Sequence, residues 1–390
     1  MWDRELSSEL RKALKQFPAI VLTGPRRAGK TFLLRNLVPD ASYCLLEDPD
    51  VLARAKADPR AFLSSLRLPV ILDEIQNCPE LLPFIRTRID LRSDSAGSKG
   101  GGKKFGNWLI TGSQEFPIMK GVTESMAGRA AVFHLLPLSF RETGKTSPLL
   151  GGFPEVLKKS SGRQTWFRSY LQTYIERDIR EIINVRDMGA YRVFIQMLAQ
   201  RNGHVLNKSE IAAPVGVKVP TITQWLSTLE ITNQIVLVKP YFRNFEKRLI
   251  KSPKLYFLDS GLLCHLLNIR TQTELDEHPA NGFIFESYLV SELLKSQINR
   301  GEAREVYYFR DETGLEVDFL VPRKNQTLEL IEAKYSQTIY PNMAKNLLSL
   351  RKNMVGVRTL LTLIHRGKTP DQQKLVDDVM AYSYQSYFEK

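Results

Sequence analysis

The sequence has little cysteine, no long apolar run and no internal repeat. Its three cysteines, Cys44, Cys78 and Cys264, lie far apart without CxxC or metal-type spacing, which favours a reducing cytoplasm over a disulfide framework. No run of 18 uncharged apolar residues occurs, and the first ten residues hold no apolar signal segment, so we expect no membrane contact. Low-complexity sequence is confined to a glycine-rich loop near residue 100.

What the sequence does contain is typical of a folded, basic, multidomain protein. Of its 390 residues, 43% are hydrophobic and 25% are charged, which excludes a wholly disordered chain. The formal net charge of +13 suggests an anionic partner, although charge alone does not separate nucleic acid from anionic lipid or plain solubility. Residues 239–254 hold six lysines or arginines against one glutamate, with three aromatic residues between them.

A glycine-rich loop follows the first apolar strand, where residues 19–31 read AIVLTGPRRAGKT and match G-x-x-x-x-G-K-[ST]. In this pattern backbone N–H groups wrap the phosphates of ATP, Lys30 reaches the β and γ phosphates, and Thr31 holds Mg²⁺. An ordinary glycine turn is the alternative, which the flanking strand and amphipathic helix disfavour. Arg26 and Arg27 either contact phosphate or remain solvated. The residues predicted to bind nucleotide are Gly24, Pro25, Arg26, Arg27, Ala28, Gly29, Lys30, Thr31 and Asp73.

Acidic and polar residues end two further apolar strands. Residues 70–74 end in Asp73 and Glu74, where phosphate-bound Mg²⁺ needs a carboxylate and an attacking water needs a base. We therefore expect Asp73 to bind the metal with Thr31 and Glu74 to act on the water. The strand in NWLITGS ends at Ser113 and Gln114, which either lie between nucleotide and water or form a simple turn.

Helical stretches at residues 50–66 and 81–91 alternate with these strands, which predicts an α/β domain with a doubly wound parallel sheet. The motifs GPRRAGKT, LLEDPDV, ILDEIQ, LITGS and LLPLSFRE resemble those of AAA+ ATPases over about the first 145 residues. More narrowly, they resemble a group of prokaryotic ATPases with an uncharacterised C-terminal region. GGFPEV from residue 151 and YIERDIREI from residue 174 extend that resemblance over most of the chain.

The resemblance implies roles for two residues that the sequence alone does not settle. It implies that Ser113 lies near the sensor-1 position and that Arg129, in the AGR of residues 127–129, is an arginine finger or sensor. Such an arginine stabilises charge at the γ-phosphate and often comes from a neighbouring subunit, so the resemblance also implies a homo-oligomer. A surface ion pair is the alternative for Arg129.

The middle of the chain predicts a winged helix. Residues 163–200 show helical periodicity, and then a helix at 208–213, a turn at Gly216 and a helix at 220–230 match a helix-turn-helix. Two strands around the basic segment would form a wing. In a DNA-binding winged helix, one group would face a groove and another would bind phosphates. The groove would be faced by Thr221, Thr223 and Gln224, and the phosphates would be bound by Arg243, Lys247, Arg248 and Lys251. A structural or protein-contact role is the alternative.

Acidic residues interrupt the apolar strands of the C-terminal part. Asp318 lies inside LEVDFLV, and Glu332 and Lys334 end TLELIEAK, with Glu286 on the preceding predicted helix. Asp318, Glu332 and Glu286 could hold Mg²⁺ while Lys334 stabilises charge at a scissile phosphate. A helix, a strand and a last helix follow. The order resembles the PD-(D/E)xK restriction-endonuclease-like fold, although Val317 replaces its usual proline. A buried Asp318–Lys334 ion pair is the alternative.

These observations predict an ATPase, with ATP and Mg²⁺ as cofactors, whose turnover acts on DNA by binding, remodelling or cleavage. The predicted catalytic residues are Glu74, Ser113, Arg129, Asp318, Glu332 and Lys334. The rival hypothesis is a regulatory ATPase whose C-terminal domains bind a protein partner. The predicted domains are an AAA+ domain at 1–150, a helical linker at 151–200, a winged helix at 201–272 and a nuclease-like domain at 273–390.

Overall fold

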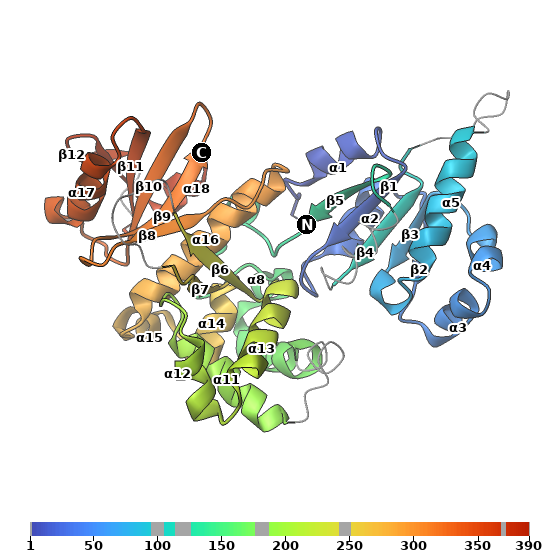
Figure 1. Ribbon diagram of the computed structural model, residues 1–390, viewed down its shortest axis with the longest axis horizontal. Helices are drawn as coiled ribbons and strands as arrows, with labels where there is room; N and C mark the ends of the chain where they lie inside the picture. Colours follow the sequence, from blue (N-terminus) through green and yellow to red (C-terminus); the bar gives the residue numbers. More distant parts are fainter. Residues whose placement is uncertain are drawn as a thin grey trace. The chain divides into compact units, whose positions relative to one another are not determined.

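The computed structural model of the chain describes residues 2–94, 105–113, 126–175, 187–241, 251–367 and 372–389 (Figure 1). It contains two compact units, one of residues 1–137 with 298–302 and one of residues 138–297 with 303–390. Within the described ranges, no helix combines the length and the apolar character that crossing a membrane requires. Gln114, Arg243, Lys247, Arg248 and most of YIERDIREI lie outside the described residues.

The first unit is built on a parallel sheet of five strands in the order β2-β3-β4-β1-β5. This confirms the α/β class predicted from the alternation of strands and helices. Strands β1 and β4 are buried along their whole length, as expected when helices cover both faces of a parallel sheet. The strands are β1 Ala19–Thr23, β2 Ser42–Leu45, β3 Val70–Asp73, β4 Trp108–Gly112 and β5 Ala130–His134.

Alternate residues of β1 point into two separate cores. Ile20 and Leu22 pack with residues of α1 (Ser7–Ala13) and α2 (Lys30–Leu37). Ala19 and Val21 belong to the opposite core, which is formed with α3 (Pro49–Ala57), α4 (Pro59–Ser65) and α5 (Leu81–Asp94). Figure 1 shows these three helices together beside β2 and β3. Because apolar residues fill both faces of the sheet, the polar residues lie at the carboxyl ends of its central strands.

The helix expected at residues 50–66 is interrupted in the structure. It forms two helices, α3 and α4, which meet at Asp58 and Pro59. The backbone of Asp58 is extended, and its carboxylate accepts hydrogen bonds from the N–H groups of Arg60 and Ala61. Because proline cannot donate the hydrogen bond that helix α3 would need to continue, Pro59 ends one helix and begins the next.

The second unit begins with helices around an aromatic core. The helices include α7 (Phe140–Thr143), α8 (Pro154–Lys158), α9 (Arg163–Tyr170), α11 (Met188–Gln200), α14 (Ser260–Leu266) and α15 (Gln272–Glu277). The two helices expected around Gly216 are present as α12 (Lys208–Val215) and α13 (Val219–Ile231). Gly216 has φ 74° and caps α12 in the left-handed conformation that glycine adopts without strain.

The two strands expected around the basic segment are also present. Strand β6 (Ile235–Pro240) pairs antiparallel with β7 (Lys254–Phe257), and the end of β6 pairs parallel with β8 (Tyr307–Arg310). Through that contact the hairpin joins an eight-stranded sheet of order β12-β13-β11-β10-β9-β8-β6-β7. The hairpin next to α13 is therefore continuous with the C-terminal sheet.

The C-terminal sheet contains one feature that the sequence analysis missed. Strands β9 (Glu316–Arg323), β10 (Thr327–Lys334) and β11 (Arg358–His365) and helices α16 (Asn281–Asn299) and α17 (Lys345–Asn353) follow the expected order. Beyond β11 we expected only a helix. The chain instead forms the antiparallel strands β12 (Gln373–Val376) and β13 (Val379–Ser383) before the short helix α18 (Tyr384–Glu389).

Candidate nucleotide site and acid–lysine centre

The glycine-rich loop lies between β1 and α2, and its backbone requires glycine at both ends. Gly24 has φ 142°, and a Cβ atom there would lie 2.1 Å from the carbonyl oxygen of Leu135. Gly29 has φ 94° and precedes the first residue of α2. Other residues rarely adopt these angles, so the loop conformation depends on the two glycines of the motif.

Lys30 is directed into this loop and not towards solvent. Its Nζ atom donates hydrogen bonds to the carbonyl oxygens of Gly24 at 2.9 Å and Pro25 at 3.0 Å, and the residue is 6% exposed. Arg26 is also buried, with its guanidinium 3.3 Å from a carboxylate oxygen of Glu47, whereas Arg27 is exposed. Of the two alternatives for Arg26, the solvated one is therefore wrong, because its charge is buried with a carboxylate beside it, and phosphate contact by Arg26 and Arg27 stays a prediction.

Asp73 lies at the end of β3 and accepts hydrogen bonds from three hydroxyl groups. Thr31 Oγ1 and Tyr43 OH donate to its Oδ2 atom at 2.8 Å and 2.7 Å, and Thr111 donates to Oδ1. The structure thus brings together Thr31 and Asp73, as predicted. A threonine hydroxyl beside a carboxylate is an oxygen donor set that fits Mg²⁺ at a nucleotide phosphate.

Glu74 has a left-handed backbone, with φ 60° and ψ 52°, and its carboxylate is held by two side chains. Ser113 Oγ donates to Glu74 Oε2 at 3.1 Å, and Gln76 Nε2 donates to the same oxygen. Burial raises the pKa of Glu74, but Lys30 and Arg26 together with the two hydrogen bonds outweigh it, so the pKa lies below its ordinary value. Glu74 is therefore an ionised carboxylate at neutral pH, as a general base must be.

Arg129 forms an ion pair within its own unit. Its Nε atom lies 2.5 Å from Asp90 Oδ1, and a second guanidinium nitrogen donates to Oδ2 at 3.1 Å. Asp90 belongs to α5, so the described contact is the surface ion pair that the sequence analysis kept as the alternative. The arginine-finger role implied by the family resemblance stays a prediction.

Three residues at this site were not predicted from the sequence. Tyr43 reaches Asp73 from the edge strand β2, and Gln76 joins Glu74 to Ser113. Arg4 donates to the carbonyl oxygens of Ala28, inside the loop, and of Leu136. Tyr43 lies two residues before LLEDPDV and Gln76 is the last residue of ILDEIQ, but neither was singled out as a site residue, and Arg4 lies outside the motifs.

A second cluster of buried charge, here called the acid–lysine centre, lies in the C-terminal unit. It consists of Lys254, Glu286, Glu316, Asp318, Glu332 and Lys334. The antiparallel register pairs Ile331 of β10 with Phe319 of β9. Glu332, which follows Ile331, is therefore opposite Asp318, which precedes Phe319, and both point to the same face of the sheet.

Hydrogen bonds and ion pairs fix each carboxylate of the centre. The N–H of Ala333 donates to Asp318 Oδ2 at 2.8 Å, and Lys334 Nζ donates to Glu332 Oε1 at 2.7 Å. Glu332 Oε2 is buried and has no hydrogen-bond partner among the described residues. The ion pair considered as the alternative, between Lys334 and Asp318, is not the pair that forms, because Lys334 pairs with Glu332, its neighbour on the same face of β10.

Helix α16 and strand β7 complete the centre. Tyr256 OH donates to Glu286 Oε2 at 2.7 Å, and Lys254 Nζ lies 3.9 Å from that oxygen and in closer contact with Glu316. Burial first, and then the charge of Asp318, raise the pKa of Glu286 and of Glu332 to about 8. Burial also raises the pKa of Asp318 above its ordinary value. The centre therefore carries fewer charges at neutral pH than its number of acidic side chains suggests.

The carboxylates of the centre do not form the metal site predicted from the sequence. Within the described ranges, no three histidine, cysteine, aspartate or glutamate side chains are placed so that they could hold a metal ion together. Glu286, Asp318 and Glu332 lie close enough to shift one another's pKa, but lysines contact two of them. As arranged, these residues do not fit a divalent cation, because ammonium groups lie against one carboxylate oxygen of Glu286 and one of Glu332.

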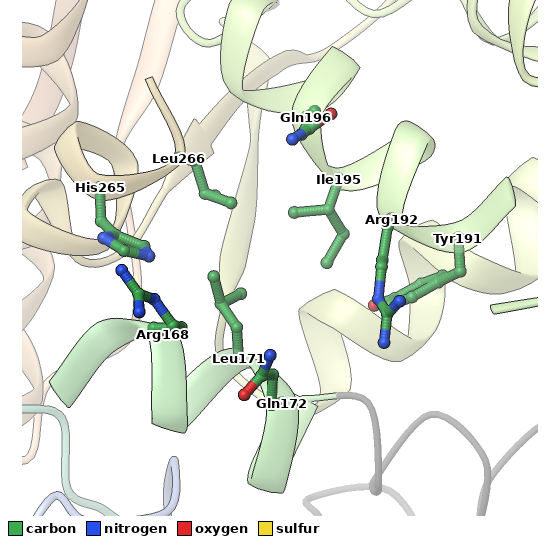
Figure 2. A pocket seen from close by; sticks show the side chains of 9 residues that line it. All are labelled: Arg168, Leu171, Gln172, Tyr191, Arg192, Ile195, Gln196, His265 and Leu266. Carbon is green, nitrogen blue, oxygen red and sulfur yellow. The ribbon is translucent and has the colours of Figure 1, made fainter. Parts of the chain in front are cut away.

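A pocket of about 190 Å³ lies among the helices of the second unit, away from every residue predicted to act. Figure 2 shows Arg168 next to His265 on one side of this pocket and Tyr191 and Arg192 on the other. Burial and the charge of Arg168 lower the pKa of His265. The lining residues are Arg168, Leu171, Gln172, Tyr191, Arg192, Ile195, Gln196, His265 and Leu266.

The relatives that the chain resembles in sequence are themselves uncharacterised proteins. It is 30% identical over 325 residues to the uncharacterised proteins Rv2008c of Mycobacterium tuberculosis and Mb2031c of Mycobacterium bovis, covering 82% of this chain and 70% of each relative. The chain belongs to the family of these mycobacterial proteins. A protein of Methanocaldococcus jannaschii, MJ1544, is 24% identical over 356 residues, covering 81% of this chain and 74% of that protein.

Three domain families match the chain along its length. Residues 16–144 match an AAA domain, residues 145–273 match a domain of unknown function (DUF8612), and residues 281–384 match another domain of unknown function (DUF4143). The N-terminal part is therefore a P-loop ATPase domain, as the glycine-rich loop predicted. The two matches that follow it assign no activity to the second unit.

Solved structures give weaker similarity. The Walker-type ATPase of Pyrococcus abyssi matches with a TM-score of 0.44 and 18% identity, covering 68% of this chain and 96% of that one. The RuvB Holliday junction branch migration motor of Thermotoga maritima matches with a TM-score of 0.32 and 15% identity, covering 60% and 88%. Neither match is close enough to transfer a function to this chain.

We predict that Ser113→Ala slows ATP turnover by roughly tenfold or more, because Glu74 loses one of the two side chains that orient its carboxylate. Nucleotide affinity, measured with a fluorescent ATP analogue, should change less than about threefold, since Ser113 does not belong to the loop. Ser65→Ala is the matched control, because the Ser65 hydroxyl bonds only its own helix at Phe62. Equal turnover in both variants would separate Ser113 from catalysis.

We also predict that the fold loses stability as pH rises. A carboxyl group whose folded-state pKa is raised stabilises the fold below its ordinary pKa of about 4.5, and this contribution is lost as pH rises through the raised value of about 8. The urea midpoint of the second unit in the full chain should therefore fall between pH 6 and pH 9. Glu332→Gln should flatten this dependence, and the exposed control Glu312→Gln should not. A midpoint that rises with pH contradicts the assignment.

Proposed function

We propose that the chain hydrolyses ATP in its first unit and uses this turnover to bind or remodel DNA through its second unit. The observation that carries the proposal is the arrangement of Lys30, the Thr31–Asp73 pair and Glu74 at the carboxyl ends of β1 and β3, the two parallel strands on either side of β4. Ligands of parallel α/β sheets bind at this edge. An ionised, oriented carboxylate one residue after a metal-binding aspartate is what attack by water on a γ-phosphate requires.

Each residue has a distinct task in this proposal. The loop N–H groups between Gly24 and Lys30 would bind phosphate oxygens, and the Lys30 ammonium would exchange its carbonyl partners for the β and γ phosphates. Thr31 and Asp73 would hold Mg²⁺, which supplies charge neutralisation at the phosphates. Glu74 would accept the proton of the attacking water, kept in place by Ser113.

The second unit supports DNA as the partner by its geometry and charge. Helices α11 to α13 followed by the β6–β7 hairpin have the order of elements expected for a winged helix, in which α13 would be the recognition helix. On α13 Gln224 is exposed, and Thr221 and Thr223 are half-buried. Lys239 and Lys251 are exposed near the ends of the hairpin strands. Exposed cations at such places bind phosphates.

The sheet of the C-terminal part supports a restriction-endonuclease-like fold, since α16, β9 and β10 present Glu286, Asp318 and the Glu332–Lys334 pair in the order of that fold. Binding or remodelling is proposed in preference to cleavage. Two of the three carboxylates that would hold a metal for cleavage, those of Glu286 and Glu332, lie in contact with lysines. The pairing of β6 with β8 connects this sheet to the hairpin, so both parts can act on one ligand.

Assembly into a homo-oligomer is part of the proposal. In an oligomer, Arg129 would exchange Asp90 for the γ-phosphate bound by a neighbouring copy. The ion pair with Asp90 is exposed enough to break at small cost, because solvent screens surface pairs. If the second unit bound a protein in place of DNA, the assignment of the nucleotide site would still hold.

We predict that ATP turnover by the full chain rises when DNA is titrated in, and that the rise weakens at higher salt because phosphate binding releases counterions. Turnover is measured with single-stranded and double-stranded DNA at two salt concentrations. Lys30→Ala is the blank and should show no turnover, because the only loop ammonium that can reach the β and γ phosphates is gone. Turnover that persists in this variant contradicts the nucleotide site, whereas normal turnover without DNA stimulation contradicts the DNA partner alone.

We further predict that the double variant Lys239→Ala, Lys251→Ala binds DNA more weakly and lowers the slope of log affinity against log salt by up to about two. Fluorescence anisotropy with a labelled duplex measures both quantities. Lys345→Ala, Lys352→Ala is the matched control, since these two lysines are also exposed in the second unit but lie on or beside α17. Equal losses in the two variants would mean that DNA binding follows net charge and not the hairpin.

A further inference from the structure

Lys254 differs from Lys239 and Lys251, the other lysines of the basic segment that the structure describes, in that it is buried. It is the last residue of the segment 239–254 and the first of β7, and it is 2% exposed, whereas Lys239 and Lys251 are exposed. Its side chain cannot bind a DNA phosphate from this position. The contacts that it makes are with the acid–lysine centre.

The surroundings of the Lys254 ammonium are those of a bound cation. Its Nζ atom contacts a carboxylate oxygen of Glu316, lies 3.9 Å from Glu286 Oε2 and is 5.5 Å from the centre of the Tyr308 ring. Asp318 is near enough to add a favourable electrostatic interaction. Lys254 therefore joins carboxylates from two different elements, α16 and β9, which no other described residue of the centre does.

A lysine in this position competes with a divalent cation for the same oxygens. The centre contains four carboxylates and two lysines, and Lys334 neutralises only Glu332 by direct contact. Two cations a few ångströms apart repel each other strongly in a poorly solvated site. A metal bound by Glu286 and Asp318 would therefore have to displace the Lys254 ammonium.

We propose that Lys254 is the internal cation of the acid–lysine centre, and that a divalent metal binds to this centre only in exchange for its ammonium group. The proposal rests on the contacts of Lys254 and not on the proposed action on DNA, so either can fail without the other. It differs from a purely structural ion pair in what it expects when Lys254 is removed. A structural pair predicts lost stability alone, whereas an internal cation also predicts gained metal affinity.

The test is Mn²⁺ binding to the nucleotide-free full chain, measured by electron paramagnetic resonance of the free ion. An Asp73→Asn background removes the carboxylate of the nucleotide site. In this background Lys254→Met should bind one Mn²⁺ at least about tenfold more tightly than its parent, because one positive charge is gone and its carboxylates remain. Adding Asp318→Asn should abolish the gain.

Two further variants keep the test decisive. Lys254→Met leaves buried acids without a cation and could lose stability, so Lys254→Met, Glu316→Gln removes the closest partner together with the lysine. This double variant should keep its circular dichroism spectrum and still bind Mn²⁺ more tightly than the parent, because Glu286 and Asp318 remain and the Lys254 ammonium is gone. Lys295→Met is the matched control, since Lys295 is equally buried and bonds Glu292 at 2.8 Å outside the centre.

The proposal is overturned if the folded variants lacking Lys254 bind Mn²⁺ no more tightly than the parent. It is overturned equally if the gained ion persists after Asp318→Asn, because the ion would then lie elsewhere. Tight binding of Mn²⁺ by the parent itself, removed by Asp318→Asn, would show that Lys254 does not exclude the metal.

Discussion

A charge removed from water must find a partner inside the protein, and this constraint organises both sites of the chain. Lys30 donates hydrogen bonds to two carbonyl oxygens of its own loop, and Asp73 accepts hydrogen bonds from three hydroxyl groups. In the second unit, Lys254 and Lys334 bond carboxylates that come from a helix and two strands. Each set of partners also fixes a geometry, because a hydrogen bond to a buried charge is short and directional. The functional side chains are therefore positioned before any ligand binds.

The two sites differ in how easily a ligand can replace those partners. Lys30 bonds neutral carbonyl oxygens, which a phosphate with its negative charge outcompetes. The loop is thus ready to exchange an internal bond for a bond to nucleotide. In the acid–lysine centre the lysines lie against carboxyl groups, so a cation that enters must overcome both repulsion from Lys254 and the loss of the contacts that Lys254 makes. This difference explains why we assign a nucleotide site to the first unit, and why we infer that Lys254 opposes cation binding in the acid–lysine centre of the second unit.

Residues that act through local sequence were predictable, and residues that act from a distance were not. The loop, Asp73 and Glu74 follow from motifs in which a strand and the next turn place the side chains. Alternation predicted that Glu332 and Lys334 share a face of one strand. Asp318 was grouped with them through the resemblance to the nuclease-like fold, and the register of β9 against β10 brings it to the same face. Tyr43 and Arg4 reach the site only through the order of strands in the sheet, which the sequence does not state. Lys254 was counted with a solvated basic segment, since nothing in its neighbours reveals that β7 packs against Glu286. The β12–β13 hairpin was missed because its polar first strand lacks an apolar pattern.

Coupling between nucleotide and DNA is the central claim, and it has a direct thermodynamic test. If nucleotide turnover drives action on DNA, then DNA affinity must differ between nucleotide states, and the difference is typically about fivefold or more. Glu74→Gln keeps the loop and Asp73 intact while removing the base, so it should hold ATP without hydrolysing it. We would measure the affinity of this variant for duplex DNA with ATP, with ADP and without nucleotide. The account predicts that the ATP-bound variant differs from the other two, and equal affinities in all three states would contradict it.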